Sequence, residues 1–256
     1  MTKRIVRGEI YPTRRDGDIE IRVVLNKDEI VVKFVNTGFF TLTTKSNICS
    51  GRVKDKLKPQ LYGVGYIGIG NIQSTESEDA QRAYRKWVAM LSRCYDQKST
   101  SYVRYGGAGV EVCKEWHSFQ NFANWYLSYK HKMPEWHLDK DLFSKGKKLY
   151  SPSTCCVIPK EINISLTSYR GSYQGDYVTG VGWDKQRRLY VTQLNMGKNL
   201  KMQAEHYQTE YEAWVAYKCA KESHLVGLAY AWKEHIAPEV FEALLKYKIK
   251  WDKNEY

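Results

Sequence analysis

The sequence contains no long apolar run, no block of like charge and no biased repeat. No stretch approaches the ~18 consecutive apolar residues of a membrane span. The basic start, Met1-Thr-Lys-Arg-Ile, continues into charged residues where a secretion signal would have an apolar core. With 43% hydrophobic and 14% aromatic residues in 256, the composition is that of a folded protein. We therefore expect one large domain or two to three small ones, in the cytoplasm and without a membrane partner.

Cysteine is scarce, and its spacing excludes the common short motifs. There are six cysteines and no C-x-x-C, so a disulfide scaffold is not expected. A structural zinc would have to draw Cys94, Cys113 and either Cys155 or Cys156 from distant parts of the chain. We expect buried free thiols instead.

Acidic residues are outnumbered. The chain has 40 Lys and Arg against 28 Asp and Glu, a formal net charge of +12 and a pI near 9.3. Residues 1–72 hold 13 cationic and 7 anionic side chains (+6), residues 73–170 hold 15 and 10 (+5), and residues 171–256 hold 12 and 11 (+1). A positive field of this size favours a polyanionic partner such as nucleic acid, and an ordinary solvated basic surface is the alternative.

The patterning divides the chain into three parts and predicts an α+β protein. Residues 1–72 alternate apolar and polar side chains in short runs, which predicts a small β-rich module. This module is a candidate for contact with DNA or another partner. In residues 73–170, Thr75 and Glu78 form a capping-box pattern for a helix over about 78–95. A second helix is expected at roughly 116–129, and then a strand, a loop, a strand and a helix opened by Pro159.

The third part, residues 171–256, contains three short strand patterns followed by helical ones. The strands are expected near 179–185, 188–195 and 199–207. Thr209 and Glu212 form another capping box, ahead of a stripe of small residues that lets a helix lie close on a sheet. Pro238 starts a last, packing helix.

Two oxygen-bearing side chains in the middle part suit a hard divalent cation beside a phosphodiester. Such a cation needs one or two oxygen ligands on rigid elements and open positions for phosphate and water. Asp139 on a predicted strand and Asn163 on the helix that follows supply that pair. An ordinary charged strand edge and a helix-surface amide are the alternative interpretation of the same residues.

These residues stand among several short motifs in one order. The motifs are Arg93-Cys94-Tyr95, Tyr105-Gly-Gly-x-Gly-Val110, Val112-Cys113-x-x-Trp116, Leu138-Asp-Lys-Asp141, Tyr150-Ser-Pro152, Cys155 and Asn163. Over about residues 78 to 166 the chain resembles the phage-encoded HNH endonucleases of the ββα-metal (His-Me finger) class, of the free-standing homing type. The resemblance implies an HNH-like nuclease module at 73–170 that uses Mg²⁺ or Mn²⁺ and acts in the host cytoplasm.

The resemblance implies roles for particular residues and leaves one role open. By position, Asp139 is the first metal ligand and Asn163 the second. Lys140 stands where the family has a general-base histidine, and Thr154 stands near the family's loop asparagine. Three possibilities remain for the base. Lys140 can serve if its surroundings favour the neutral amine, His137 can serve from the same strand face as Asp139, or the site has no base and is inactive.

Residues 179–222 resemble the three-stranded DNA-binding domain of plant ethylene-response factors, which also occurs attached to phage HNH nucleases. That fold lays its sheet in the DNA major groove. Strand alternation puts Tyr190 on one face and Leu189 and Val191 on the other, and we expect the apolar face to meet the helix. The expected DNA contacts are Trp183, Lys185, Arg188, Tyr190, Lys201 and Gln203. An ordinary amphipathic sheet under a helix is the alternative.

Taken together, these features predict a phage-type endonuclease that hydrolyses double-stranded DNA with one divalent metal. A single ββα-metal site cuts one strand, so a monomer should nick, while the oligomeric state stays open. The alternative is a DNA-binding or regulatory protein with a decayed HNH site, because the base histidine is missing. A host-defence antagonist that binds a protein is a third possibility.

Overall fold

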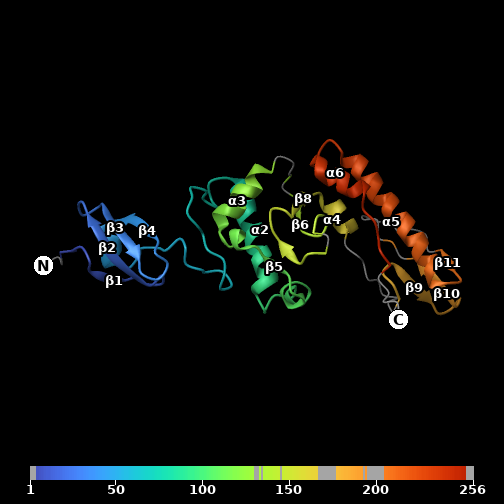
Figure 1. The fold of residues 1–256 in the computed structure, drawn as a ribbon, viewed down its shortest axis with the longest axis horizontal. Helices are drawn as coiled ribbons and strands as arrows, with labels where there is room; N and C mark the ends of the chain where they lie inside the picture. Colours follow the sequence, from blue (N-terminus) through green and yellow to red (C-terminus); the bar gives the residue numbers. More distant parts are fainter. Residues whose placement is uncertain are drawn as a thin grey trace. The chain divides into compact units, whose positions relative to one another are not determined.

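The computed structural model describes residues 4–129, 133, 135–144, 146–166, 177–192, 194 and 205–251. The protein mixes helices with several small sheets, an arrangement compatible with the expected α+β class (Figure 1). Its contacts divide it into two compact units, residues 1–127 and 128–256. The residues expected to form the nuclease module therefore fall into both units, and each unit is described by itself.

The first unit begins with a four-stranded antiparallel sheet in the order β1-β2-β3-β4. The strands are β1 (Ile10–Pro12), β2 (Asp18–Val24), β3 (Ile30–Phe34) and β4 (Phe40–Thr43), followed by the short helix α1 (Lys45–Cys49). Alternation places every second side chain in the core along β3 and along β2 as far as Ile21, where the register of the pairing shifts. The buried set includes Ile19, Ile21, Ile30, Val32 and Phe34.

Helix α2 (Glu78–Tyr95) has the bounds that the apolar stripe predicts. Its N-cap differs from the prediction. The hydroxyl of Ser77, not that of Thr75, accepts the N–H of Ala80 at 3.1 Å. The capping box expected from Thr75 and Glu78 is therefore wrong, because the helix begins at Glu78 and Ser77, directly before it, is the residue in reach of its free N–H groups.

Short elements and a second helix complete the first unit. They are the 3₁₀ turns η1 (Tyr102–Arg104), η2 (Gly106–Ala108) and η3 (Lys114–His117), strand β5 (Glu111–Val112) and helix α3 (Phe119–Ser128). The indole N–H of Trp87 on α2 donates to the carbonyl of Trp116 at 2.7 Å. Gly106 lies so close to α2 that a Cβ there would be 2.0 Å from the carbonyl oxygen of Cys94, so this glycine is required by close approach.

The second unit contains the strand, loop, strand and helix that the sequence predicts. Strand β6 (His137–Asp139) pairs antiparallel with β8 (Cys156–Ile158), and β7 (Leu149–Tyr150) lies in the long connection between them. Helix α4 (Lys160–Leu166) follows β8 directly after Pro159. These two short paired strands and the helix that follows them carry the candidate site.

A three-stranded antiparallel sheet and two helices complete the second unit. The sheet has the order β11-β10-β9, from β9 (Val181–Asp184), β10 (Leu189–Thr192) and β11 (His206–Tyr207). Helix α5 (Glu210–Trp232) opens with the predicted capping box of Thr209 and Glu212, and α6 (Pro238–Leu245) begins at the predicted proline. Residues 199–204, most of the third strand expected at 199–207, lie outside the described residues.

Helix α5 connects the sheet to α4. Its first half packs on the sheet, where the ring of Tyr217 covers Gly180 so closely that a Cβ there would lie 2.3 Å from the ring. Further along, His224 of α5 is 3.1 Å from the hydroxyl of Ser165 on α4. The indole N–H of Trp232 donates to the carboxylate of Glu161 on α4 at 3.2 Å.

Two expectations about the whole chain can be compared with the described residues. Cys94, Cys155 and Cys156 are buried free thiols as expected, whereas Cys49 and Cys219 are exposed. The expectation of buried thiols is therefore wrong for those two. Within the described part of the chain, no helix has the length and apolar character needed to cross a membrane.

Candidate functional site

Strand β6 and helix α4 bring two predicted site residues into contact. His137 and Asp139 are two residues apart on β6 and therefore share one face of the strand. Helix α4 follows β8 and buries Ile162. On the next residue, Asn163, the amide nitrogen lies 3.0 Å from Nδ1 of His137. The fold thus joins residues 26 positions apart in the sequence.

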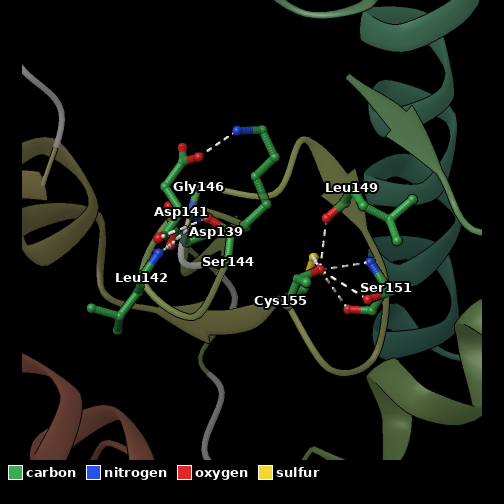
Figure 2. Close-up of polar contacts among 10 residues, drawn as sticks. Asp139, Asp141, Leu142, Ser144, Gly146, Leu149, Ser151 and Cys155 are labelled. Carbon is green, nitrogen blue, oxygen red and sulfur yellow. Dashed lines mark hydrogen bonds and ion pairs between the residues drawn. The ribbon is translucent and has the colours of Figure 1, made fainter. Parts of the chain in front are cut away.

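The carboxylate of Asp139 is buried, with 6% of the residue exposed. Its Oδ1 accepts the backbone N–H groups of Asp141 at 3.0 Å and Leu142 at 2.9 Å (Figure 2). Burial raises the pKa of this carboxyl, while the backbone N–H groups and the nearby Lys140 ammonium oppose the rise. The turn after β6 therefore holds the carboxylate in one orientation through Oδ1. Oδ2 takes no part in these two hydrogen bonds.

Lys140 turns toward the neighbouring carboxylate. Its ammonium forms an ion pair with Oδ1 of Asp141, and only 12% of the lysine side chain is exposed against 66% of the aspartate side chain. A lysine can act as a general base only when its amine is unprotonated. An ammonium engaged with a carboxylate does not offer one, so this arrangement favours His137 over Lys140 as the base.

The contact between Asn163 and His137 can form in two ways, because the amide and the imidazole each have two orientations or tautomers. If the amide N–H donates to Nδ1, the ring carries its proton on Nε2. If the amide oxygen accepts from Nδ1–H, Nε2 keeps a free lone pair. Only the second arrangement makes His137 a proton acceptor, and in it the residue that orients the ring is Asn163.

Thr154 closes the loop that precedes β8. Its hydroxyl donates to the carbonyl of Leu149 at 2.6 Å and accepts the backbone N–H of Ser151 at 3.0 Å. The hydrogen bonds around Leu149, Ser151 and Cys155 are drawn in Figure 2. Threonine at this position therefore fastens the loop through its own hydroxyl.

The donors at the end of β6 fit one hard cation better than a zinc ion. Among the residues that the structure describes, no three His, Cys, Asp or Glu side chains gather as a metal-binding group. Cys156, opposite Asp139 in the hairpin, is a poor ligand because burial raises its pKa well above that of an ordinary thiol. The carboxylate of Asp139 and the side-chain amide of Asn163 are oxygen donors of the kind that Mg²⁺ and Mn²⁺ prefer.

Tyr247 is a residue near this site that the sequence does not reveal. Burial and the charges of Asp139 and Asp141 raise the pKa of its phenol. The segment after α6 thus reaches the electrostatic surroundings of the end of β6. No motif or periodicity surrounds Tyr247, so only the folded chain associates it with Asp139.

In the three-stranded sheet, two of the expected DNA contacts lie in the turn between β9 and β10. Lys185 and Arg188 are exposed there, and Arg188 has a positive φ of 56°. Asp184 organises this turn. It accepts the backbone N–H groups of Gln186 and Arg187, and its Oδ2 lies 2.9 Å from both the Arg187 guanidinium and the His206 ring. These contacts hold the pKa of Asp184 well below its usual range.

The expected division of this sheet into two faces is wrong for Tyr190. Tyr190 packs against the cluster between the sheet and α5, and its cross-strand partner Trp183 lies on the same side as the buried Val181. The rings of Trp183 and Tyr190 meet edge to face at 4.8 Å. Aromatic residues can pack on the helix as well as aliphatic ones, so these two rings face α5 rather than an outer surface. Lys201 and Gln203 lie outside the described residues.

No family model, curated protein or solved structure matches this chain. Its function is therefore inferred from the residues and contacts described above.

Proposed function

We propose that this protein is an endonuclease that hydrolyses phosphodiester bonds of double-stranded DNA with a single divalent cation. One observation carries the proposal. The strand β6 ends in a buried carboxylate, Asp139, and the helix after the hairpin places Asn163 against His137 on the same strand face. These contacts support the proposal, because a candidate metal ligand, a second candidate oxygen donor and a candidate base lie on β6 and the helix that contacts it.

Asp139 and Asn163 would hold the cation. Asp139 offers Oδ2, since Oδ1 is engaged by two backbone N–H groups. The amide oxygen of Asn163 has two lone pairs, so it can accept from His137 and still act as a ligand. A bound Mg²⁺ or Mn²⁺ supplies neutralisation of the scissile phosphate and stabilisation of the leaving 3′ oxygen.

His137 is the proposed base. With Asn163 accepting from Nδ1–H, Nε2 takes a proton from the attacking water while the water oxygen bonds to phosphorus and the P–O3′ bond breaks. The leaving oxygen receives its proton from solvent. Lys140 keeps its ion pair with Asp141 and contributes positive charge beside the carboxylate of Asp139.

The deciding experiment uses supercoiled plasmid DNA with Mg²⁺, with Mn²⁺ and with chelator, and scores nicked and linear products. The parent should nick in either metal, and Asp139→Ala should reduce the rate by at least about 10³-fold, because it removes the proposed metal ligand. Asp28→Ala, a substitution of an exposed aspartate in the first unit, is the matched control and should cut like the parent. Equal cutting by Asp139→Ala would contradict the proposal.

A second candidate function is a DNA-binding or regulatory protein on a decayed nuclease core. The ion pair between Lys140 and Asp141 favours it, because the side chain at the family's general-base position is engaged with a neighbouring carboxylate. This candidate predicts duplex binding by the parent with no nicking in either metal. A metal-dependent nick that Asp139→Ala abolishes would rule it out.

A further inference from the structure

Helix α2 carries a line of half-buried cations along one flank, beside its buried stripe. At 100° per residue, Arg82, Lys86 and Arg93 fall within about 40° of one another, and they span about 16 Å along the axis. Arg85 borders this line and is exposed. The buried stripe contains Ala80, Ala83, Trp87, Met90, Leu91 and Cys94.

These cations differ in whether a carboxylate neutralises their charge. The guanidinium of Arg82 is bound by Asp79 at 2.8 Å and Glu78 at 3.1 Å. The other two guanidiniums have uncharged neighbours, since Arg85 donates to the amide of Gln81 at 3.3 Å and Arg93 lies 5.6 Å from the centre of the Tyr105 ring. The positive charge is therefore concentrated on the second half of the line.

The pKa of Lys86 reflects the positive electrostatic potential of this part of α2. Burial lowers the pKa of its ammonium, and repulsion from Arg93, Arg82 and Arg85 lowers it further. Three guanidiniums repel the ammonium of Lys86 on this surface. An approaching polyanion offsets that repulsion and is therefore attracted to the surface. A row of phosphates along a duplex is such a polyanion, and phosphate contacts need only charge and reach.

We propose that the exposed Arg85 and the half-buried Lys86 and Arg93 beside it on α2 form a binding surface for the phosphate backbone of duplex DNA. The inference rests on the proposed function in taking duplex DNA as the ligand, and it adds a surface in the first unit that holds the substrate by its backbone. Because phosphates carry no base identity, binding through this surface is independent of sequence. Arg82, already bound by two carboxylates, contributes less.

The test compares triple variants that remove the same charge from different places. One is Arg85→Gln/Lys86→Gln/Arg93→Gln, and the control is Lys27→Gln/Lys246→Gln/Lys250→Gln at exposed positions. The affinity for a short duplex is measured over a series of salt concentrations without metal. The slope of log K against log salt is negative, and each lost phosphate contact reduces its magnitude by about 0.9. The α2 variant should therefore lose about 2 to 3 from the slope, and the control should keep the parent's slope.

A double variant guards against a folding defect, because Arg93→Gln also removes the contact with Tyr105. Arg85→Gln/Lys86→Gln leaves that contact in place and should still lose about 2 from the slope. Equal slopes for the α2 variants and the control overturn the proposal, as does a parent that binds no duplex or prefers anionic lipid vesicles. Failure of the nuclease proposal is a separate result, seen as absent cutting while the slope difference persists.

Discussion

A single contact between two side chains decides what the site can do. His137 is a base only if the amide oxygen of Asn163 accepts its Nδ1–H, and Asn163 reaches the ring from a different element. Lys140, the residue that follows Asp139 in the sequence, is engaged with Asp141. The order of residues along the chain thus points to Lys140, and the geometry points to His137.

Substitution of His137 should separate these two candidates. We expect His137→Ala to lower the nicking rate by about 10²-fold or more, the usual contribution of a positioned base. Lys140→Ala should change the rate by less than about 10-fold, because its ammonium acts only through charge. Single-turnover nicking at saturating metal measures both.

Added imidazole gives an independent check on the same assignment. It should restore part of the rate of His137→Ala, since it can replace the lost proton acceptor, and it should not restore Asp139→Ala. The assignment fails if Lys140→Ala abolishes nicking while His137→Ala cuts at the parental rate.

Among the elements, α2 shows how local signals predict a helix and where they mislead. Its bounds follow from the spacing of apolar residues, a property of the segment itself. Its N-cap does not, because Thr75 and Ser77 are both good capping residues and the choice depends on where the preceding turn ends.

The two candidate caps differ in the stability they should contribute. Ser77→Ala removes the bond to the Ala80 N–H and should cost about 1 kcal/mol of unfolding free energy. Thr75→Ala should cost less than about 0.5 kcal/mol, since Thr75 is exposed and outside the helix. Chemical denaturation of the two variants measures the difference. A larger loss for Thr75→Ala would show that the cap is assigned to the wrong residue.

Strand β10 shows the limit of strand alternation. Alternation correctly separates Tyr190 from Leu189 and Val191, because neighbouring side chains point to opposite faces. It does not say which face a helix covers. In the fold, Tyr190 packs with Val181 and Tyr217 under α5, since large aromatic rings bury more apolar area than the aliphatic side chains opposite them.

For the whole molecule, α5 matters because it contacts both the three-stranded sheet and α4. Lys221, in the middle of this helix, is 3% exposed, and burial lowers its pKa from 10.5 to about 8. The unfolded chain binds more protons than the folded one between these values. Stability therefore rises with pH from about 8 to 10.5, and the cost of the buried ammonium is fully present below pH 8.

Lys221→Met should remove this cost. We expect the variant to be more stable than the parent by about 2 to 3 kcal/mol at pH 7, with a difference that shrinks toward pH 10.5. Lys246→Met, at an exposed lysine with 77% of its side chain accessible, is the control and should show no such trend. Denaturation at several pH values measures all three proteins, and a pH-independent difference would contradict the assignment.

The sequence by itself determined the order of the elements. It predicted the short strands before residue 72, the helix at 78–95, and the strand, loop, strand and helix around Asp139 and Asn163. It also predicted the helix capped by Thr209 and the helix that begins at Pro238. These follow from spacing, capping and turn residues, which act within a few positions. Only the tertiary structure decided that Asn163 meets His137, that Lys140 pairs with Asp141 and that Tyr247 lies within the field of Asp139. Such contacts depend on how separate elements pack, and no local signal in the chain encodes the distance between side chains that are far apart in sequence.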